Sequence, residues 1–258
     1  FIPVNKPGGS GAEALRYLKD KAGDNHTVMI TLNSVFTTPQ LNPGLGVDIT
    51  EFTPIARMAV DTFLLWVASD SGINTLEDWV NAVKNAGKGW KMGGTGQGQE
   101  DSLITGMLEG EFGVTMTYVP FPGGGTVAKN LIGKHIDSTV NNPSEQMGFY
   151  EAKQSRPLMA MTPERMPQFP DVPTSAELGH PDLVYYMQRN IFGPPGMSKE
   201  AQAFYIDVFR KVFDSTQWVD FTNSDGLIRD WLAGDDLGAF AKTVNEQHTK
   251  LLKTMGKL

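Results

Sequence analysis

A chain of 258 residues is long enough for one large domain or two lobes, and its 40% apolar and 20% charged residues exclude a disordered protein. The 22 Lys and Arg against 29 Asp and Glu give a formal net charge of −7, which leaves no net basic field for nucleic acid or anionic lipid. No apolar run approaches the ~18 residues of a membrane span, so no direct membrane insertion is expected. Without cysteine, the chain has no disulfide, thiolate nucleophile or cysteine-based zinc site.

The beginning of the chain alternates amphipathic and apolar segments, which is typical of layered α/β folds. Ser10-Gly11-Ala12-Glu13 has the capping-box pattern of a helix start, and the apolar stripe behind it ends at Gly23. The continuous apolar run 28–32 predicts a buried parallel strand. At its carboxyl end, the polar Asn33-Ser34 is expected to begin a loop rich in Thr and Pro.

The following segments repeat this alternation. A strand is predicted over residues 63–68. Thr75 and Asp78 form a second capping box, and the helix behind them is expected to stop near Gly87. The glycine-rich stretch 88–98 then interrupts the pattern, so we place a boundary between two lobes there.

The second lobe is predicted to comprise residues 89–190 and to contain further strand and helix units. We expect these as a helix over 100–112, a strand at 115–119, a helix through Val127, Leu131 and Ile132 that is closed by Gly133, and strands at 136–140 and 158–161. Its proline-rich segment 163–173 predicts an ordered, non-helical stretch. The chain is helical from Ser198, with a last helix over 236–255, and these helices complete a first lobe made of residues 1–88 and 191–258.

Catalytic and metal-binding patterns are missing from the sequence. The four histidines are far apart and stand in no metal-ligand spacing. There is no G-x-S-x-G elbow, and the loop 93–98 lacks the G-x-G-x-x-G spacing of a dinucleotide site. We therefore assign no catalytic residue, no metal and no cofactor.

Two glycine-rich turns in the second lobe each stand just before a predicted helix. Glycine lets successive backbone N–H groups converge, and a helix start adds unpaired donors and a partial positive charge, so such turns suit a carboxylate. The alternative is that these glycines only serve tight connections. The candidate ligand-binding residues of the two turns are Thr95, Gly96, Gly98, Gln99, Gly123, Gly124, Gly125 and Thr126.

Three polar residues outside these turns are further candidates. Asn141 and Asn142 follow a predicted strand at its carboxyl end, where open α/β sheets place ligands, although Asn-Pro is also a common turn starter. Arg189 is an isolated cation among aromatic and apolar neighbours. It can pair bidentately with a ligand carboxylate or, alternatively, with a structural acid.

Ordered motifs that carry a family resemblance cover essentially the whole chain. They are Asn5-Lys6-Pro7-Gly8-Gly9-Ser10-Gly11, Asn42-Pro43 with Phe52-Thr53-Pro54-Ile55-Ala56, Gly93-Gly94-Thr95-Gly96-Gln97-Gly98-Gln99, Tyr118-Val119-Pro120-Phe121-Pro122-Gly123-Gly124, Leu131-Ile132-Gly133-Lys134-His135-Ile136-Asp137, Phe169-Pro170-Asp171-Val172-Pro173-Thr174-Ser175-Ala176-Glu177 and Pro194-Pro195-Gly196. The stretch that starts at Phe169 is the most specific, being close to L-P-D-V-P-T-x-A-E. Together these motifs resemble the substrate-binding proteins of tripartite tricarboxylate transporters, the TctC or Bug receptors.

The resemblance implies an α/β, two-lobed, periplasmic-binding-protein-like fold of type II with the ligand cleft between the lobes. It also implies a periplasmic receptor that captures a small organic acid and delivers it to the membrane permease subunits of the transporter, without catalysis. The two glycine turns match the family's carboxylate-binding loops, and Ser34 is expected to face them from the other lobe. Arg189 favours a dicarboxylate as the ligand, and a monomer is expected.

Three departures from the family pattern limit what is carried over. The family normally begins with a strand and a P-F-x-x-G-G-x-x-D loop that nothing before Phe1 matches, and no signal peptide is present in this chain. The serine and following histidine of the family loop correspond here to Gln99 and Ser102, and its usual W-x-G reads Arg189-Asn190-Ile191.

Two other functions remain open at this point. One is an enzyme that acts on a carboxylate substrate, with Glu100, Asp101 or Asp137 as general base, although carboxylates at helix starts are usually caps. The other is a sensory binding module that uses the same capture of an organic acid.

Overall fold

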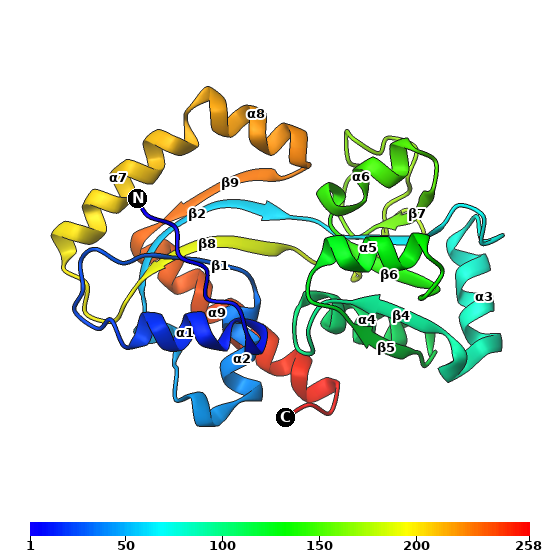
Figure 1. The fold of residues 1–258 in the computed structure, drawn as a ribbon, viewed down its shortest axis with the longest axis horizontal. Coiled ribbons are helices and arrows are strands. Elements are labelled where there is room, and N and C mark those ends of the chain that lie inside the picture. Colours follow the sequence, from blue (N-terminus) through cyan, green and yellow to red (C-terminus); the bar gives the residue numbers. More distant parts are fainter. The chain divides into compact units, whose positions relative to one another are not determined.

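Two compact units make up the protein in the computed structural model, which describes residues 1–258 (Figure 1). Unit 1 comprises Phe1–Asp61 and Met187–Leu258, and unit 2 comprises Thr62–Tyr186. The chain therefore crosses from one unit to the other twice. Each unit has its own sheet and its own helices.

Unit 1 is built on a four-stranded antiparallel sheet in the order β1-β8-β2-β9. Its strands are β1 (Met29–Thr31), β8 (Met187–Gly193), β2 (Thr53–Asp61) and β9 (Ile228–Ala233). The carboxyl end of β2 pairs with the beginning of β8, because Asp61 lies opposite Met187. The two crossings between the units therefore leave unit 1 at one end of its sheet.

Helices cover both faces of the unit 1 sheet, as Figure 1 shows. They are α1 (Ala12–Lys19), α2 (Ser34–Leu41), α7 (Lys199–Phe213), α8 (Thr216–Asp225) and α9 (Gly234–Thr254). One core joins α1, α2 and α9 around Phe36 and Phe192. The other lies under α7, around Ile55, Ile191 and Tyr205. The prediction that the C-terminal helices complete the first lobe is confirmed.

Unit 2 is built on a five-stranded mixed sheet in the order β5-β4-β6-β3-β7. Its strands are β3 (Leu64–Ala68), β4 (Lys91–Gly94), β5 (Thr117–Pro120), β6 (Ser138–Asn141) and β7 (Ser155–Ala160). β4, β5 and β6 run parallel, whereas β3 is antiparallel to both of its neighbours. The carboxyl ends of β4, β5 and β6 therefore share one edge of the sheet.

The helices of unit 2 connect these strands. They are α3 (Leu76–Ala86), α4 (Glu100–Phe112), α5 (Gly124–Ile132) and α6 (Pro143–Glu151), and the whole chain also has short 3-10 turns at Gly9–Gly11, Pro43–Leu45, Ile49–Glu51 and Gly87–Gly89. The predicted capping box of α3 is present, since the Thr75 hydroxyl accepts from the Asp78 N–H at 3.1 Å. Trp66 and Phe169 lie in the core around α5.

The region after residue 28 differs from the sequence prediction. The apolar run forms an antiparallel edge strand, not a buried parallel one, and its central Ile30 is 73% exposed. The expected loop after it is the helix α2, which tolerates Pro39 close to its end. An apolar run alone does not say which sheet or which position a strand takes, and this explains the error.

The predicted capping box at Ser10 does not start α1. Ser10 lies in a 3-10 turn with φ 54°, and the N-cap of α1 is Gly11 with φ 91°. The local pattern is overridden by a tight glycine turn that places the Ser10 carbonyl where it accepts from the Thr38 hydroxyl at 2.7 Å. The helix then ends at Lys19, before the predicted Gly23.

The lobe boundaries also need correction. The sequence prediction placed residues 62–88 in the first lobe, but β3 pairs with β6 and β7, so this segment belongs to unit 2. The second boundary falls after Tyr186 and not after residue 190, because β8 joins the sheet of unit 1. The glycines in 88–98, read as an interruption, form β4 and the turn behind it. The strands β2, β8 and β9 and the helix α6 were not predicted.

Candidate functional site

Three strand-to-helix junctions lie along one edge of the unit 2 sheet. Gly94, at the end of β4, is the register partner of Pro120 at the end of β5, and Gly93 is that of Thr139 in β6. The helices α4, α5 and α6 begin just beyond these strand ends. Helix starts carry unpaired N–H groups and a partial positive charge, so this edge favours negatively charged groups.

The first junction is the turn 95–99. Side chains of the turn and of α4 accept hydrogen bonds from its backbone N–H groups. The Thr95 N–H donates to Oδ2 of Asp101 at 2.8 Å. The Gly96 N–H donates to Oε1 of Gln99 at 2.6 Å. The Gly98 N–H donates to Oγ of Ser102 at 2.8 Å. The turn that was predicted to offer its amides to a carboxylate therefore binds oxygens of its own chain.

Gly94 and Tyr118 hold this turn against the sheet. The Tyr118 hydroxyl donates to the Thr95 carbonyl at 2.8 Å, and burial raises the pKa of this phenol. A Cβ on Gly94 would lie 2.2 Å from the Tyr118 oxygen and 2.6 Å from Cβ of Asp101. Only glycine fits where these two side chains meet the strand end.

The second junction is the turn Gly123 to Thr126 at the start of α5. The N–H groups of Thr126 and Val127 donate to the Gly123 carbonyl at 2.9 and 3.1 Å. Those of Gly124 and Gly125 stand in the first turn of the helix and have no acceptor within it. Gly125 and Thr126 are exposed, whereas Gly124 is buried. This turn therefore presents exposed polar groups at the edge.

The third junction is a hydrogen-bonded network around Asn141 and Asn142. Oε2 of Glu145 accepts from Nδ2 of Asn141 at 2.6 Å and from the Asn142 N–H at 3.2 Å. The Asn141 Oδ1 accepts from Nε2 of Gln146 at 2.9 Å. Nδ2 of Asn142 donates to the Thr62 carbonyl at 2.7 Å, which fixes the start of α6 to the segment just before β3. Both predicted asparagines are thus buried parts of a structural network.

The second and third junctions meet at Gly124. A Cβ added to this glycine would lie 1.7 Å from Oε1 of Glu145, so the Glu145 carboxylate rests directly on the start of α5. Asp101, on α4, is buried, and its pKa is raised well above the usual range by burial and then by the negative charge of Glu145 and of Glu100. The edge therefore combines helix N-termini with three side-chain carboxyl groups.

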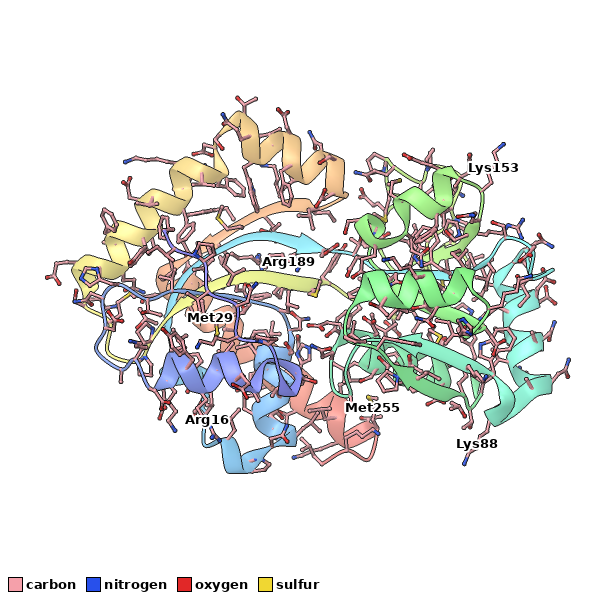
Figure 2. The ribbon with its side chains drawn as sticks, viewed as in Figure 1. Arg16, Met29, Lys88, Lys153, Arg189 and Met255 are labelled. Carbon is pink, nitrogen blue, oxygen red and sulfur yellow. The ribbon has the colours of Figure 1, made fainter.

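Ser34 and Arg189 belong to unit 1. Ser34 is the first residue of α2 and is buried. Arg189 lies on β8 (Figure 2), and its Nη2 pairs with Oδ2 of Asp61, a carboxylate with no exposed surface. The arginine side chain keeps 31% of its surface exposed. Arg189 therefore pairs with a structural acid, which is one of its two predicted alternatives, while part of its side chain stays exposed.

The structure brings ten of the twelve predicted site residues to the edge of unit 2. Four side chains that shape this edge were not among the candidate site residues, namely Ser102, Tyr118, Glu145 and Gln146. A signal for one of them was present, because Asn142 followed three residues later by Glu145 is a capping-box pattern. Glu100 and Asp101 were named only as candidate general bases of the alternative enzyme function.

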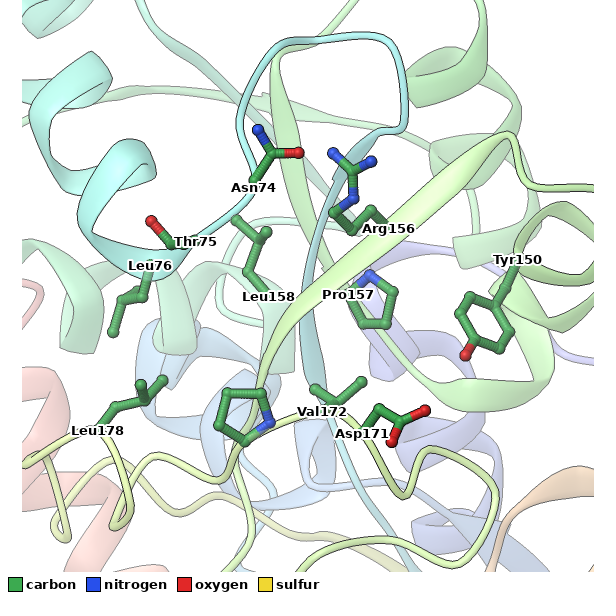
Figure 3. Close-up of a pocket in the computed structure, with 11 residues that line it drawn as sticks. Asn74, Thr75, Leu76, Tyr150, Arg156, Pro157, Leu158, Asp171, Val172 and Leu178 are labelled. Atoms are coloured by element: carbon green, nitrogen blue, oxygen red, sulfur yellow. The ribbon is translucent and has the colours of Figure 1, made fainter.

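A separate hollow of about 420 Å³ lies along β7, the last strand of the unit 2 sheet (Figure 3). Apolar side chains such as Leu76 and Leu158 line it, and Arg156 and Asp171 stand among them. Nη1 of Arg156 donates to the Ile73 carbonyl at 2.8 Å, so this cation is already used to hold the start of α3. None of the predicted site residues lines this hollow.

Metal-ligand clusters and membrane-spanning helices are both absent from the structure. No group of three or more His, Asp and Glu side chains is arranged to hold a metal ion. No helix combines the length and the apolar character that a bilayer crossing requires.

A comparison with protein-family models matches residues 2–256 to the tripartite tricarboxylate transporter family receptor, TctC. Among curated proteins, the UPF0065 protein in the gbd 5' region of Cupriavidus necator is 24% identical over 259 residues, which is 99% of this chain and 77% of that protein.

Among solved structures, R. palustris Rpa4515 with adipate has a TM-score of 0.91 at 23% identity and is matched over 99% of this chain and 86% of its own. The periplasmic binding protein BugD has a TM-score of 0.89 at 19% identity, over 98% of this chain and 86% of its own. These likenesses confirm the α/β, two-sheet fold of periplasmic binding proteins that the sequence predicted.

Proposed function

Because this chain belongs to the TctC family of tripartite tricarboxylate transporter receptors, a family of binding proteins and not of enzymes, we propose that it captures a small organic acid at the unit 2 edge described above. The proposed ligand class is a carboxylate, and a dicarboxylate is the first candidate, since the similar protein Rpa4515 has a structure with adipate. The proposed location is the periplasm, and the proposed partners are the membrane permease subunits of the transporter. The proposed state in solution is a monomer.

The observation that carries this proposal is the convergence of three helix starts on one sheet edge. Ligands of open α/β sheets bind beyond the carboxyl ends of parallel strands, and β4, β5 and β6 end together there. The start of α5 is the part of the edge with exposed donors, at Gly125 and Thr126. A ligand carboxylate accepts hydrogen bonds there and interacts favourably with the helix dipole.

The energetics of such capture are modest. A micromolar ligand needs only about −8 kcal/mol of binding free energy. Hydrogen bonds to a charged group contribute about 1.5–3 kcal/mol each, so a few donors at the start of α5 supply a large part of it. Ser34 and the partly exposed Arg189 side chain, both in unit 1, are further proposed ligand donors.

A thermal-shift screen against small organic acids, followed by calorimetry of each hit, tests the proposal. A ligand of micromolar Kd at millimolar concentration stabilises the folded protein by about 4 kcal/mol, which is a clear shift. Thr126→Val removes a hydroxyl and Gly125→Pro removes an N–H from the first turn of α5, where proline is tolerated.

Both substitutions are expected to weaken a carboxylate ligand by about tenfold, the equivalent of one lost charge-assisted hydrogen bond. Thr216→Val is the matched control, because Thr216 is an exposed threonine in the first turn of α8 in unit 1. A folded protein that binds no organic acid, or that binds one equally well after both α5 substitutions, contradicts the proposal.

A further inference from the structure

A row of polar side chains crosses the sheet of unit 1 beneath α2 and α9. Asn190 of β8 is the register partner of Thr31 on β1 and of Arg57 on β2. Residues directly opposite each other in an antiparallel pair place their side chains on the same face. Phe192, two residues further along β8, packs in the core of α2 and α9, so Asn190 points to the same face. The row is therefore enclosed between the sheet and these helices.

Arg57 is buried in this row with its charge compensated. Its Nη2 pairs with Oδ2 of Asp230 on β9 at 2.7 Å, and its Nη1 donates to Oε1 of Gln188 at 3.1 Å. Its Cζ also lies 4.5 Å from the centre of the Phe240 ring on α9. Only 10% of the side chain is exposed, yet its Nε–H donates to no protein group. One buried donor of Arg57 is therefore left for another partner.

Asn190 lies next to Arg57 in the row and has no exposed surface. Neither its Nδ2 nor its Oδ1 hydrogen-bonds a protein group, so the observation holds whichever way the amide is turned. The Thr31 hydroxyl donates to the backbone carbonyl of Asn190 at 3.3 Å and not to its amide. A buried amide without partners is costly, so a partner from outside the chain is expected here.

The unpaired groups decide the chemistry of that partner. Nε of Arg57 and Nδ2 of Asn190 only donate, whereas Oδ1 of Asn190 only accepts. An anion would leave the acceptor unpaired, and a metal cation would leave both donors unpaired. The charge of Arg57 is already balanced by Asp230, so no ion is needed for neutrality. Water both donates and accepts, and buried waters typically bond about two to four such groups.

We propose that unit 1 holds an ordered water molecule between Arg57 and Asn190, which accepts from the Nε–H of Arg57 and hydrogen-bonds the Asn190 amide. Polar contacts then run from Asp230 on β9 through Arg57 and Asn190 to Thr31 on β1, and they connect all four strands of the sheet. The Asp230 side chain is 37% exposed, so the β9 end of the row is open to solvent. This site does not depend on the proposed ligand.

A high-resolution crystal structure of the protein tests this inference directly. The expected result is a water peak at a distance of about 2.7–3.2 Å from Nε of Arg57 and from one amide atom of Asn190. An Asn190 amide that bonds only protein groups, a space between the two side chains without density, or an ion in place of the water overturns the inference.

Asn190→Leu gives a second readout in solution, because leucine has a similar size and no polar side-chain atom. Oxygen-17 magnetic relaxation dispersion counts long-lived internal waters, and this variant is expected to hold at least one fewer than the parent. Asn223→Leu is the matched control, since Asn223 is exposed on α8 and the same atoms are exchanged. An unchanged count in folded Asn190→Leu overturns the inference. If this variant does not fold, the crystal structure of the parent decides alone.

Discussion

Replacing Arg189 by alanine separates a structural role of this cation from a role in binding. Asp61 has no exposed surface and pairs with Arg189, so the substitution leaves a buried carboxylate without its cation. Breaking a buried ion pair on one side costs about 3–5 kcal/mol. Because 31% of the Arg189 side chain is exposed, and water therefore reaches part of the pair, we expect a loss at the lower end, about 3 kcal/mol.

Urea unfolding monitored by circular dichroism measures this loss, with Asp61→Asn/Arg189→Ala as the compensating variant. Removing both charges takes away the uncompensated carboxylate, so the double variant is expected to recover most of the free energy of unfolding. A single variant within about 0.5 kcal/mol of the parent, as for an ordinary surface substitution, refutes the structural reasoning. So does a double variant that is no more stable than the single one.

The Arg189→Ala variant also tests whether Arg189 contributes to ligand binding. If Arg189 also binds the second carboxylate of a dicarboxylate, Arg189→Ala weakens that ligand by about 1.5–3 kcal/mol and spares a monocarboxylate. Calorimetry at a temperature where both proteins are folded measures the two affinities. An equal loss for both ligand classes shows that the effect of the substitution passes through Asp61 and the fold.

Three further substitutions follow from the unit 2 structure. Gly124→Ala is expected to lower the free energy of unfolding by about 1–3 kcal/mol, because its Cβ displaces the hydrogen-bonded Glu145 carboxylate. Gly125→Ala is expected to be neutral or stabilising, because a Cβ at this position meets no atom within 4 Å. Equal effects of the two substitutions in urea unfolding contradict this. Burial raises the pKa of Asp101, so folding favours its protonated form, and the parent loses stability as pH rises through that pKa, by up to about 1.4 kcal/mol per pH unit. Asp101→Asn is expected to lack this decline. If the urea midpoints of the parent and of Asp101→Asn change in the same way from pH 4 to 8, this account of Asp101 is wrong. Thr75→Ala removes the side-chain cap of α3 and is expected to lower the free energy of unfolding by about 1 kcal/mol, which Thr75→Ser largely restores. An alanine variant as stable as the parent shows that the cap is dispensable.

The candidate site was predictable where its residues are close in sequence. The turns at 95–99 and 123–126 are recognisable in the sequence by their glycines ahead of predicted helices, and the structure places both at strand ends. What the pattern did not show is how the N–H groups of these turns are used. The contact of Glu145 with Gly124 joins two junctions that are 21 positions apart along the chain, and spacing gives no indication of it.

The sequence by itself determined the local units of this protein. Periodicity, capping boxes and terminal glycines depend on neighbours within a few residues, and for that reason α3, α4 and α5 have nearly the predicted bounds. Only the tertiary structure decided which sheet each strand joins, because strand pairing is a contact between distant segments. In that structure, residues 62–88 belong to unit 2, Ile30 is exposed on an edge strand, and Arg189 pairs with Asp61, which is 128 positions away in the chain.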